Sequence, residues 1–177
     1  MSAPSISIRE YRPGDEASIV DCMRRVFGAG TPEGRERTLE HWQWEFAKNP
    51  TGLWRILVAV DDAAGGKVVG QYAGVPIRMF DRGRVTIATQ GVDSMVDPAY
   101  RGGLKRPGLF ATLGMEWESR FVRSDVDPLL YGIPVPVAWR IGNAFLRYEV
   151  VRTQPVLYRE PLSPLARGRG VEIVELE

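Results

Sequence analysis

The chain has 177 residues, 44% of them hydrophobic, and its 23 Lys and Arg residues nearly balance 22 Asp and Glu residues. This length predicts one folding unit, and the formal charge of +1 gives no reason to expect nucleic acid or a membrane as a partner. No segment approaches the ~20 apolar residues that span a bilayer and no signal peptide is recognisable, so a cytoplasmic location is expected.

The N-terminal part predicts a strand followed by a helix. Ile6 and Ile8 alternate with polar neighbours, and Asp15 follows a Pro-Gly turn at a position that can cap a helix. Beyond it, apolar residues with helical spacing form one stripe, made up of Ile19, Cys22, Met23, Val26 and Phe27. Cys22 is the only cysteine, which excludes an intrachain disulfide, and it is expected to face the core.

A second, shorter helix is predicted from Thr38 to Lys48. Its apolar face is expected to consist of Leu39, Trp42 and Phe46. His41 and Glu45 lie four residues apart and are expected to form a pair on the helix surface. Because His41 is the only histidine, no multi-histidine metal site can be built and no metal is expected.

Three successive antiparallel strands are predicted next, over residues 56–60, 67–78 and 84–96, separated by glycine-containing turns. In the third of these strands, Val85 and Ile87 share one parity of the side-chain alternation, whereas Val92 and Val96 share the other. The face of the strand must therefore switch near Gly91, and a β-bulge would do this.

The remaining predicted elements are a helix, a strand, a helix and a last strand, over residues 109–121, 129–133, 138–146 and 150–158. Residues 1–162 are thus expected to form the domain, and the Pro-, Gly- and Arg-rich tail, residues 163–177, is left unassigned. Its ending, VEIVELE, leaves two interpretations open, a shortened chain or an edge for pairing in a homodimer.

The most informative segment is VDSMVDPAYRGGLKRPGLFATL, residues 92–113, in which a strand leads through glycines and cations into a helix. The glycines that let backbone N–H groups approach a ligand are Gly102, Gly103 and Gly108. The start of the helix adds unpaired donors and the positive end of its dipole. Mobile positive charge comes from Arg101, Lys105 and Arg106. This combination suits a pyrophosphate, whose oxygens accept from both amides and cations.

Two common nucleotide-binding loops are excluded. Gly103 and Gly108 have the glycine spacing of a Walker loop, but Leu109 and Phe110 follow them in place of Lys and Ser or Thr. No GxGxxG follows a strand with a carboxylate further on, which removes the dinucleotide-binding fingerprint.

What remains resembles the GNAT superfamily of N-acetyltransferases, in which a strand ending V-x-P-x-x-R leads into a glycine-containing loop and a helix. Val96, Pro98 and Arg101 match this pattern in register, and the stretch HWQWEFAKNPTG is similar to a segment of one GNAT subgroup. The predicted element order over residues 5–160 is also that of GNAT folds. The resemblance implies an α/β (α+β) fold, with a mixed, mostly antiparallel central sheet flanked by helices. It also implies direct transfer of an acetyl group from acetyl-CoA to an amine.

The resemblance further implies where acetyl-CoA binds. Its pantetheine arm would pair with the backbone of Ser94, Met95 and Val96. The pyrophosphate would lie on Arg101, Gly102, Gly103, Lys105, Arg106, Pro107, Gly108, Leu109 and Phe110. The loop is about four residues longer than the family standard, because Leu104 stands where a glycine is expected. Whether Arg101 or Lys105 holds the phosphates is left open.

The family's general acid is usually a tyrosine in the last helix, about five residues before the aromatic of a Gly-aromatic pair. Here Arg147 replaces that glycine before Tyr148, which places Asn143 at the usual tyrosine position. An amide cannot protonate a thiolate, so Tyr148 and Tyr131 are the candidates for the acid. A non-catalytic acyl-CoA-binding or regulatory module on the same fold is the alternative function.

Asp93 is the candidate base for removing a proton from the acceptor amine, because it precedes the strand end predicted to bind pantetheine. The alternatives are a solvated strand residue or a structural ion pair of Asp93 with Arg78 or Arg84. The sequence does not identify the acceptor, which is set by the shapes of loops.

Overall fold

The computed structural model describes residues 4–28, 37–102 and 107–153. The elements in chain order are β1 (Ile6–Glu10), α1 (Glu16–Met23), α2 (Leu39–Trp42), β2 (Arg55–Asp61), β3 (Lys67–Asp81), β4 (Arg84–Val96), α3 (Leu109–Phe121), β5 (Leu129–Gly132) and α4 (Pro136–Phe145). The five strands form one sheet in the order β1-β2-β3-β4-β5, in which only the β4–β5 pair is parallel. The predicted mixed, mostly antiparallel sheet flanked by helices is confirmed.

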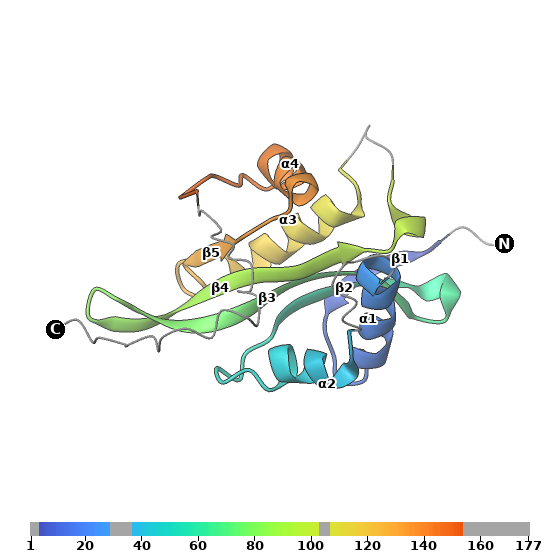
Figure 1. Cartoon of the computed structure of the whole chain (residues 1–177), viewed down its shortest axis with the longest axis horizontal. Helices are drawn as coiled ribbons and strands as arrows, with labels where there is room; N and C mark the ends of the chain where they lie inside the picture. The colour runs from blue at the N-terminus through green and yellow to red at the C-terminus, as the bar shows by residue number, and fades with distance from the viewer. Residues whose placement is uncertain (1–3, 29–36, 103–106, 154–177) are drawn as a thin grey trace, which may run out of the picture.

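The helices cover both faces of the sheet, with α1 and α2 on one side and α3 and α4 on the other (Figure 1). Each face has its own apolar core, because alternate strand residues point to opposite sides. The core on the α1–α2 face includes Ile19, Trp42, Phe46, Ile56, Val58 and Met95. The core on the α3 face includes Leu57, Tyr72, Val96, Leu113, Trp117 and Leu146. None of the described helices is both long and apolar enough to cross a membrane.

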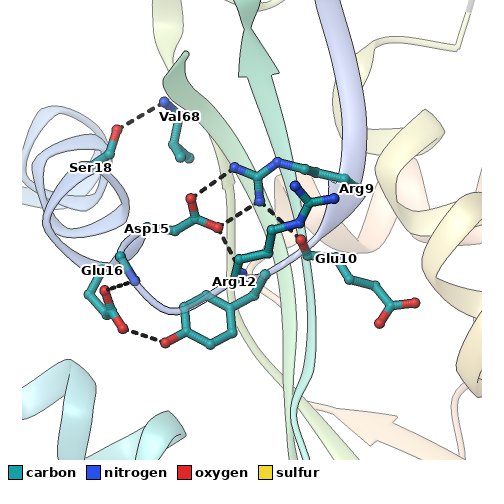
Figure 2. Close-up of polar contacts among 9 residues, drawn as sticks. Arg9, Glu10, Arg12, Asp15, Glu16, Ser18 and Val68 are labelled. Atoms are coloured by element: carbon teal, nitrogen blue, oxygen red, sulfur yellow. Dashed lines mark hydrogen bonds and ion pairs between the residues drawn. The ribbon is translucent and has the colours of Figure 1, made fainter.

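Polar contacts at the start of helix α1 hold it against the sheet (Figure 2). Asp15 stands directly before α1, as predicted, but its carboxylate makes no capping bond to the helix. It accepts instead from the Arg9 guanidinium of β1, at 2.7 and 2.8 Å, and from the Arg12 backbone N–H. The bond to Arg9 lowers the pKa of Asp15. Ser18 then accepts from the Val68 N–H at 2.9 Å, which joins α1 to β3.

Cys22 lies in the core, as predicted, and burial raises the pKa of its thiol to about 11. At pH 8 the thiol is therefore protonated and inaccessible, and the thiolate is the reactive form. We expect the native protein to react with Ellman's reagent far more slowly than the same protein in guanidinium chloride, which would expose one thiol per chain. Prompt reaction of the native protein at pH 8 would contradict this packing.

The predicted second helix is present as α2 and a π-helical turn, Gln43–Ala47, that continues it. Trp42 and Phe46 are buried as predicted, but Leu39 is 40% exposed. The prediction that Leu39 belongs to the apolar face is therefore wrong. Leu39 is the first residue of the helix, where the chain is only beginning to turn onto the core.

The C-terminal predictions are confirmed in part. Helix α4 begins at Pro136, two residues before the predicted start, because proline fits the first turn of a helix, where its missing N–H is not needed. Residues 150–153 belong to no strand, so the predicted last strand does not begin at Val150. The rest of that strand and the tail, residues 163–177, lie outside the described residues.

Candidate functional site

Strand β4 contains a bulge close to its C-terminal end. Ala73 of β3 pairs with Val92, whereas Gln71 pairs with Met95, so β4 has one residue more than β3 over this interval. Asp93 lies in the bulge and adopts a positive φ of 46°. The predicted face switch is present, and its centre is at Asp93, two residues beyond Gly91. A short aspartate side chain tolerates the left-handed conformation that this bulge requires.

The edge of β4 beyond the bulge has no neighbour in the described sheet. The parallel pairing of β4 with β5 stops at Gly91 and Gly132, although β4 continues to Val96. Met95 and Val96 pair with Gln71 and Gly70 of β3 on one side, whereas Ser94 lies in the bulge and accepts from the Ala73 N–H through its hydroxyl. No described strand pairs with these three residues on the other side. An extended ligand containing amides can hydrogen-bond to such a strand edge.

The loop after β4 leads into α3 through a short 3-10 turn, Pro98–Tyr100. Asp97 accepts from the Ala99 N–H at 3.0 Å, and this bond orders the turn. Arg101 donates from Nε to the Val96 carbonyl at 3.0 Å, so its guanidinium lies at the end of β4. Gly102 follows Arg101 on the surface.

The N-terminus of α3 lies at the far end of this loop. Gly108 is its N-cap residue and provides no side chain to cap the first N–H groups, so these donors stay available. Pro107 and Leu109 flank Gly108, and Phe110 packs against Tyr72 with 5.5 Å between ring centroids. The other predicted loop residues, Gly103, Lys105 and Arg106, lie outside the described residues. The choice between Arg101 and Lys105 as the phosphate-binding cation therefore stays open.

Tyr148 lies on the α3–α4 face, where its hydroxyl shares a hydrogen bond with the Tyr72 hydroxyl. Burial raises the pKa of Tyr148, which keeps the phenol neutral at physiological pH. Arg147 has a φ of 51°, the conformation that the glycine expected there by resemblance would adopt easily. Gly142 makes room for the ring, because a Cβ at that position would lie 2.2 Å from Tyr148.

The two remaining residues of the predicted acid region have different surroundings. Asn143 donates to the Tyr148 carbonyl at 3.1 Å, so its amide supports the turn after α4. Tyr131 lies on β5 opposite Gln90 and is 41% exposed, and its hydroxyl makes no hydrogen bond to any described residue. The two candidate tyrosines thus differ in burial and in hydrogen bonding.

Asp93 has a different ion-pair partner from those predicted. Both of its carboxylate oxygens accept from the Arg37 guanidinium, at 2.8 and 3.0 Å, so the proposed pairing with Arg78 or Arg84 is wrong. Arg78 donates instead to the Pro50 carbonyl. Burial raises the pKa of Asp93, and Arg37 partly opposes that shift.

Two further polar residues, Gln71 and Glu45, lie near Asp93, and neither was assigned a role at the site from the sequence. Gln71 is fully buried and donates from Nε2 to the Asp93 carbonyl at 3.2 Å. Glu45 is in contact with His41 at 3.6 Å, as predicted, but its side chain is only 19% exposed and is not on the surface. Burial and the charge of Asp93 raise the pKa of Glu45 to about 7, while Arg37 opposes them. A glutamine within the apolar run VVGQYAGV was the signal that could have revealed Gln71.

A bulged β4 that separates from β5 and leads into α3 is the arrangement expected of a GNAT fold, and comparison with solved structures shows that the chain has this fold. A Trypanosoma brucei acetyltransferase is 20% identical, with a TM-score of 0.62 over 88% of this chain and 100% of that one. The aminoglycoside N-acetyltransferase AAC(6')-Iy, in complex with CoA, is 12% identical, with a TM-score of 0.58 over 90% of this chain and 97% of that one. A transcriptional regulator from Bacillus halodurans is 15% identical, with a TM-score of 0.63 over 88% of this chain and 100% of that one.

Comparison by sequence gives no relative. No family model matches the chain, and no curated protein matches it. The structural similarity therefore establishes the fold, and the activity has to be argued from the site.

Proposed function

We propose that this protein is an N-acetyltransferase that transfers the acetyl group of acetyl-CoA to an amine. The observation that carries the proposal is an edge of β4 that no described strand pairs with, followed along the chain by the uncapped N-terminus of α3. A strand edge suits the amides of a pantetheine arm, and a helix N-terminus suits a pyrophosphate. These two binding elements occur in the order in which the two parts of CoA are connected.

In this proposal each part of the donor has its own residues. The pantetheine arm pairs with the backbone of Ser94, Met95 and Val96. The described part of the pyrophosphate site consists of Arg101, Gly102, Pro107, Gly108, Leu109 and Phe110, while Gly103, Lys105 and Arg106 remain part of the sequence-based prediction. The structural similarity to an acetyltransferase in complex with CoA supports this assignment of the donor.

Transfer would be direct, with the amine attacking the thioester carbonyl. The bulge at Asp93 turns backbone amides of β4 out of the regular ladder, where they can polarise that carbonyl. Tyr148 is the preferred acid for the departing thiolate, because it is a neutral phenol on the α3–α4 face, the side where α3 would hold the donor. Holding both reactants in one geometry would supply most of the acceleration.

A thiol-release assay over a panel of primary amines, including aminoglycosides, tests this function. We expect at least one amine to release CoA thiol above the hydrolysis background, and the buried Cys22 should contribute little signal. Binding of acetyl-CoA without turnover of any amine would instead support the non-catalytic module. The amine panel is needed because the fold does not identify the acceptor.

Replacing Arg101 by alanine tests the anion site separately. Loss of one charge-assisted contact is expected to raise the KM for acetyl-CoA about tenfold, with a smaller effect on kcat. Arg123→Ala is the matched control, because Arg123 is an exposed arginine that pairs with Asp125 at the far end of α3. Equal KM values for the two variants would mean that Arg101 does not bind acetyl-CoA, and would favour Lys105 as the phosphate-binding cation.

A further inference from the structure

Four polar side chains meet on the α1–α2 face of the sheet, directly at the β4 bulge. They come from separate parts of the chain, and three of them lie around the fourth, Asp93. Arg37, which precedes α2, holds the Asp93 carboxylate, and Gln71 of β3 donates to the Asp93 carbonyl. Glu45, in the turn that continues α2, is close enough for the charges of Asp93 and Arg37 to act on it. We refer to Arg37, Glu45, Gln71 and Asp93 as the bulge cluster.

Two acceptor atoms of the bulge cluster have no donor within the described part of the chain. Glu45 Oε2 and Gln71 Oε1 are both buried, and neither has a hydrogen-bond partner among the described residues. His41 Nε2 lies 3.6 Å from Glu45 Oε2, beyond hydrogen-bonding distance. The orientation of the Gln71 amide follows from its neighbour, because the opposite orientation would place its oxygen against the Asp93 carbonyl oxygen. Buried acceptors without donors are costly, and native structures rarely retain them without a reason.

A ligand that satisfies these oxygens must supply N–H or O–H donors. A primary ammonium has three donors and a positive charge, and the charge matches the carboxylate of Glu45. Arg37 does not fill this role, because its guanidinium is turned to the two oxygens of Asp93 and makes no hydrogen bond to Glu45 Oε2 or Gln71 Oε1. The unsatisfied atoms therefore indicate a cation with several N–H groups.

We propose that Glu45 Oε2 and Gln71 Oε1 form the subsite for the acceptor's primary ammonium, and that Glu45 removes its proton. This inference rests on the proposed function, because it assigns the acceptor side of the same reaction. Asp93, the base proposed from the sequence, becomes a positioning residue. Its carbonyl orients Gln71, and its carboxylate is occupied by Arg37.

The chemistry balances in the following way. The ammonium R–NH3+ gives one proton to the Glu45 carboxylate, and the free amine forms an N–C bond with the thioester carbonyl carbon. The C–S bond then breaks, and CoA leaves as a thiolate that takes a proton from the acid Tyr148. The acceptor nitrogen loses its second proton as the amide forms, and this proton returns to Tyr148 through solvent. Deprotonation of Glu45 to solvent then completes the cycle, with one net proton released for each amide formed.

The electrostatics of the site suit a base. The charged or titratable groups facing Glu45 are Asp93 on β4, Arg37 before α2, and His41 on α2 itself. Burial and Asp93 raise the pKa of Glu45 to about 7, against the opposing effect of Arg37. A base with a pKa near the working pH combines a substantial ionised fraction with useful basicity.

The Glu45→Gln variant tests the inference, since it keeps the shape of the side chain and removes the base. Its kcat/KM for the best amine is expected to fall about 100-fold. The wild-type kcat/KM should rise with pH through about 7 as Glu45 ionises. The variant should lack this rising limb of the pH–rate profile. Glu40→Gln is the matched control on the exposed side of α2 and should retain both the rate and the limb. A Glu45→Gln variant with the wild-type rate and pH profile would overturn the inference.

A stability measurement shows whether the variant folds and reports on Glu45 itself. Because the pKa of Glu45 is higher in the folded state than in an unfolded chain, the stability linked to its protonation is present at low pH. It is lost as the pH rises through about 7. Glu45→Gln is therefore expected to raise Tm at pH 8 by about 4 °C and to change it little at pH 5. A lower Tm at both pH values would mean that Glu45 is only structural.

A binding measurement separates failure of this inference from failure of the proposed function, because it needs no turnover. Butylammonium chloride at high millimolar concentration, with CoA present, is expected to raise the Tm of the wild-type protein and not that of Glu45→Gln. An equal shift in both proteins would contradict the ammonium subsite even if the enzyme is active. A shift confined to the wild type, together with no turnover of any amine, would refute the acetyltransferase while retaining the subsite.

Discussion

Asp127→Ala is expected to lower the free energy of unfolding by about 3–5 kcal/mol, the usual cost of removing one partner of a buried ion pair. Asp127 is fully buried and accepts from Arg55 at 2.6 and 2.8 Å. It also accepts from the Thr89 hydroxyl at 2.7 Å. The substitution leaves the Arg55 guanidinium, which is 12% exposed, without its counter-charge. These contacts join β2 and β4 to the segment that precedes β5, so the same loss would loosen the place where β4 and β5 separate.

Thermal unfolding followed by circular dichroism measures this effect, and a fall in Tm of about 10 °C is expected. Asp125→Ala is the matched control two residues away, because Asp125 is 71% exposed and pairs only with the exposed Arg123 among the described residues. Exposed pairs contribute about 0–1 kcal/mol, so this control should unfold close to the wild type. Similar Tm values for the two variants would mean that Asp127 does not hold the sheet together.

Tyr148→Phe is expected to lower kcat about 100-fold, a moderate loss for removing a general acid. The ring should remain seated over Gly142, so the Kd for acetyl-CoA should change little. Since burial raises the pKa of Tyr148, the wild-type rate should not fall at high pH until the phenol ionises, above its ordinary pKa. Steady-state kinetics and calorimetry with acetyl-CoA measure the two quantities separately.

Two comparisons decide whether the hydroxyl of Tyr148 acts in catalysis or in packing. Tyr72→Phe removes the same hydrogen bond but keeps the Tyr148 hydroxyl, so its kcat should fall much less. A shared loss of Tm and kcat in both variants would indicate a structural hydrogen bond. A large loss in Tyr131→Phe with none in Tyr148→Phe would identify Tyr131 as the acid.

The donor side of the site could be predicted from the sequence because its chemistry is local. Val96, Pro98 and Arg101 lie within one short segment, and the glycines and the helix start follow directly. The structure confirms the strand ending at Val96 and the start of α3 at Leu109. Hydrophobic spacing likewise predicted α1, α3 and the antiparallel strands, because each element covers an apolar core with one face.

The acceptor side depends on tertiary packing, which no local pattern contains. Arg37 lies far from Asp93 in the sequence. It is the ion-pair partner of Asp93, in place of Arg78 or Arg84, because of where α2 packs on the sheet. The bulge was expected near Gly91 because the side-chain alternation of the strand switches face there. The alternation does not fix the position of the extra residue, and in the structure Asp93 adopts the positive φ of the bulge. Glu45 was expected on the helix surface because it follows His41 by four residues, and this spacing contains no information about the burial of Oε2 in the folded chain.

Isothermal titration calorimetry tests most directly whether acetyl-CoA binds along the β4 edge and at the N-terminus of α3. This binding mode predicts saturable binding of one acetyl-CoA per chain, and much weaker binding of S-acetylpantetheine, which has the strand-pairing arm but lacks the pyrophosphate. The absence of any acetyl-CoA binding at millimolar concentration, or equal affinity for the two compounds, would contradict it.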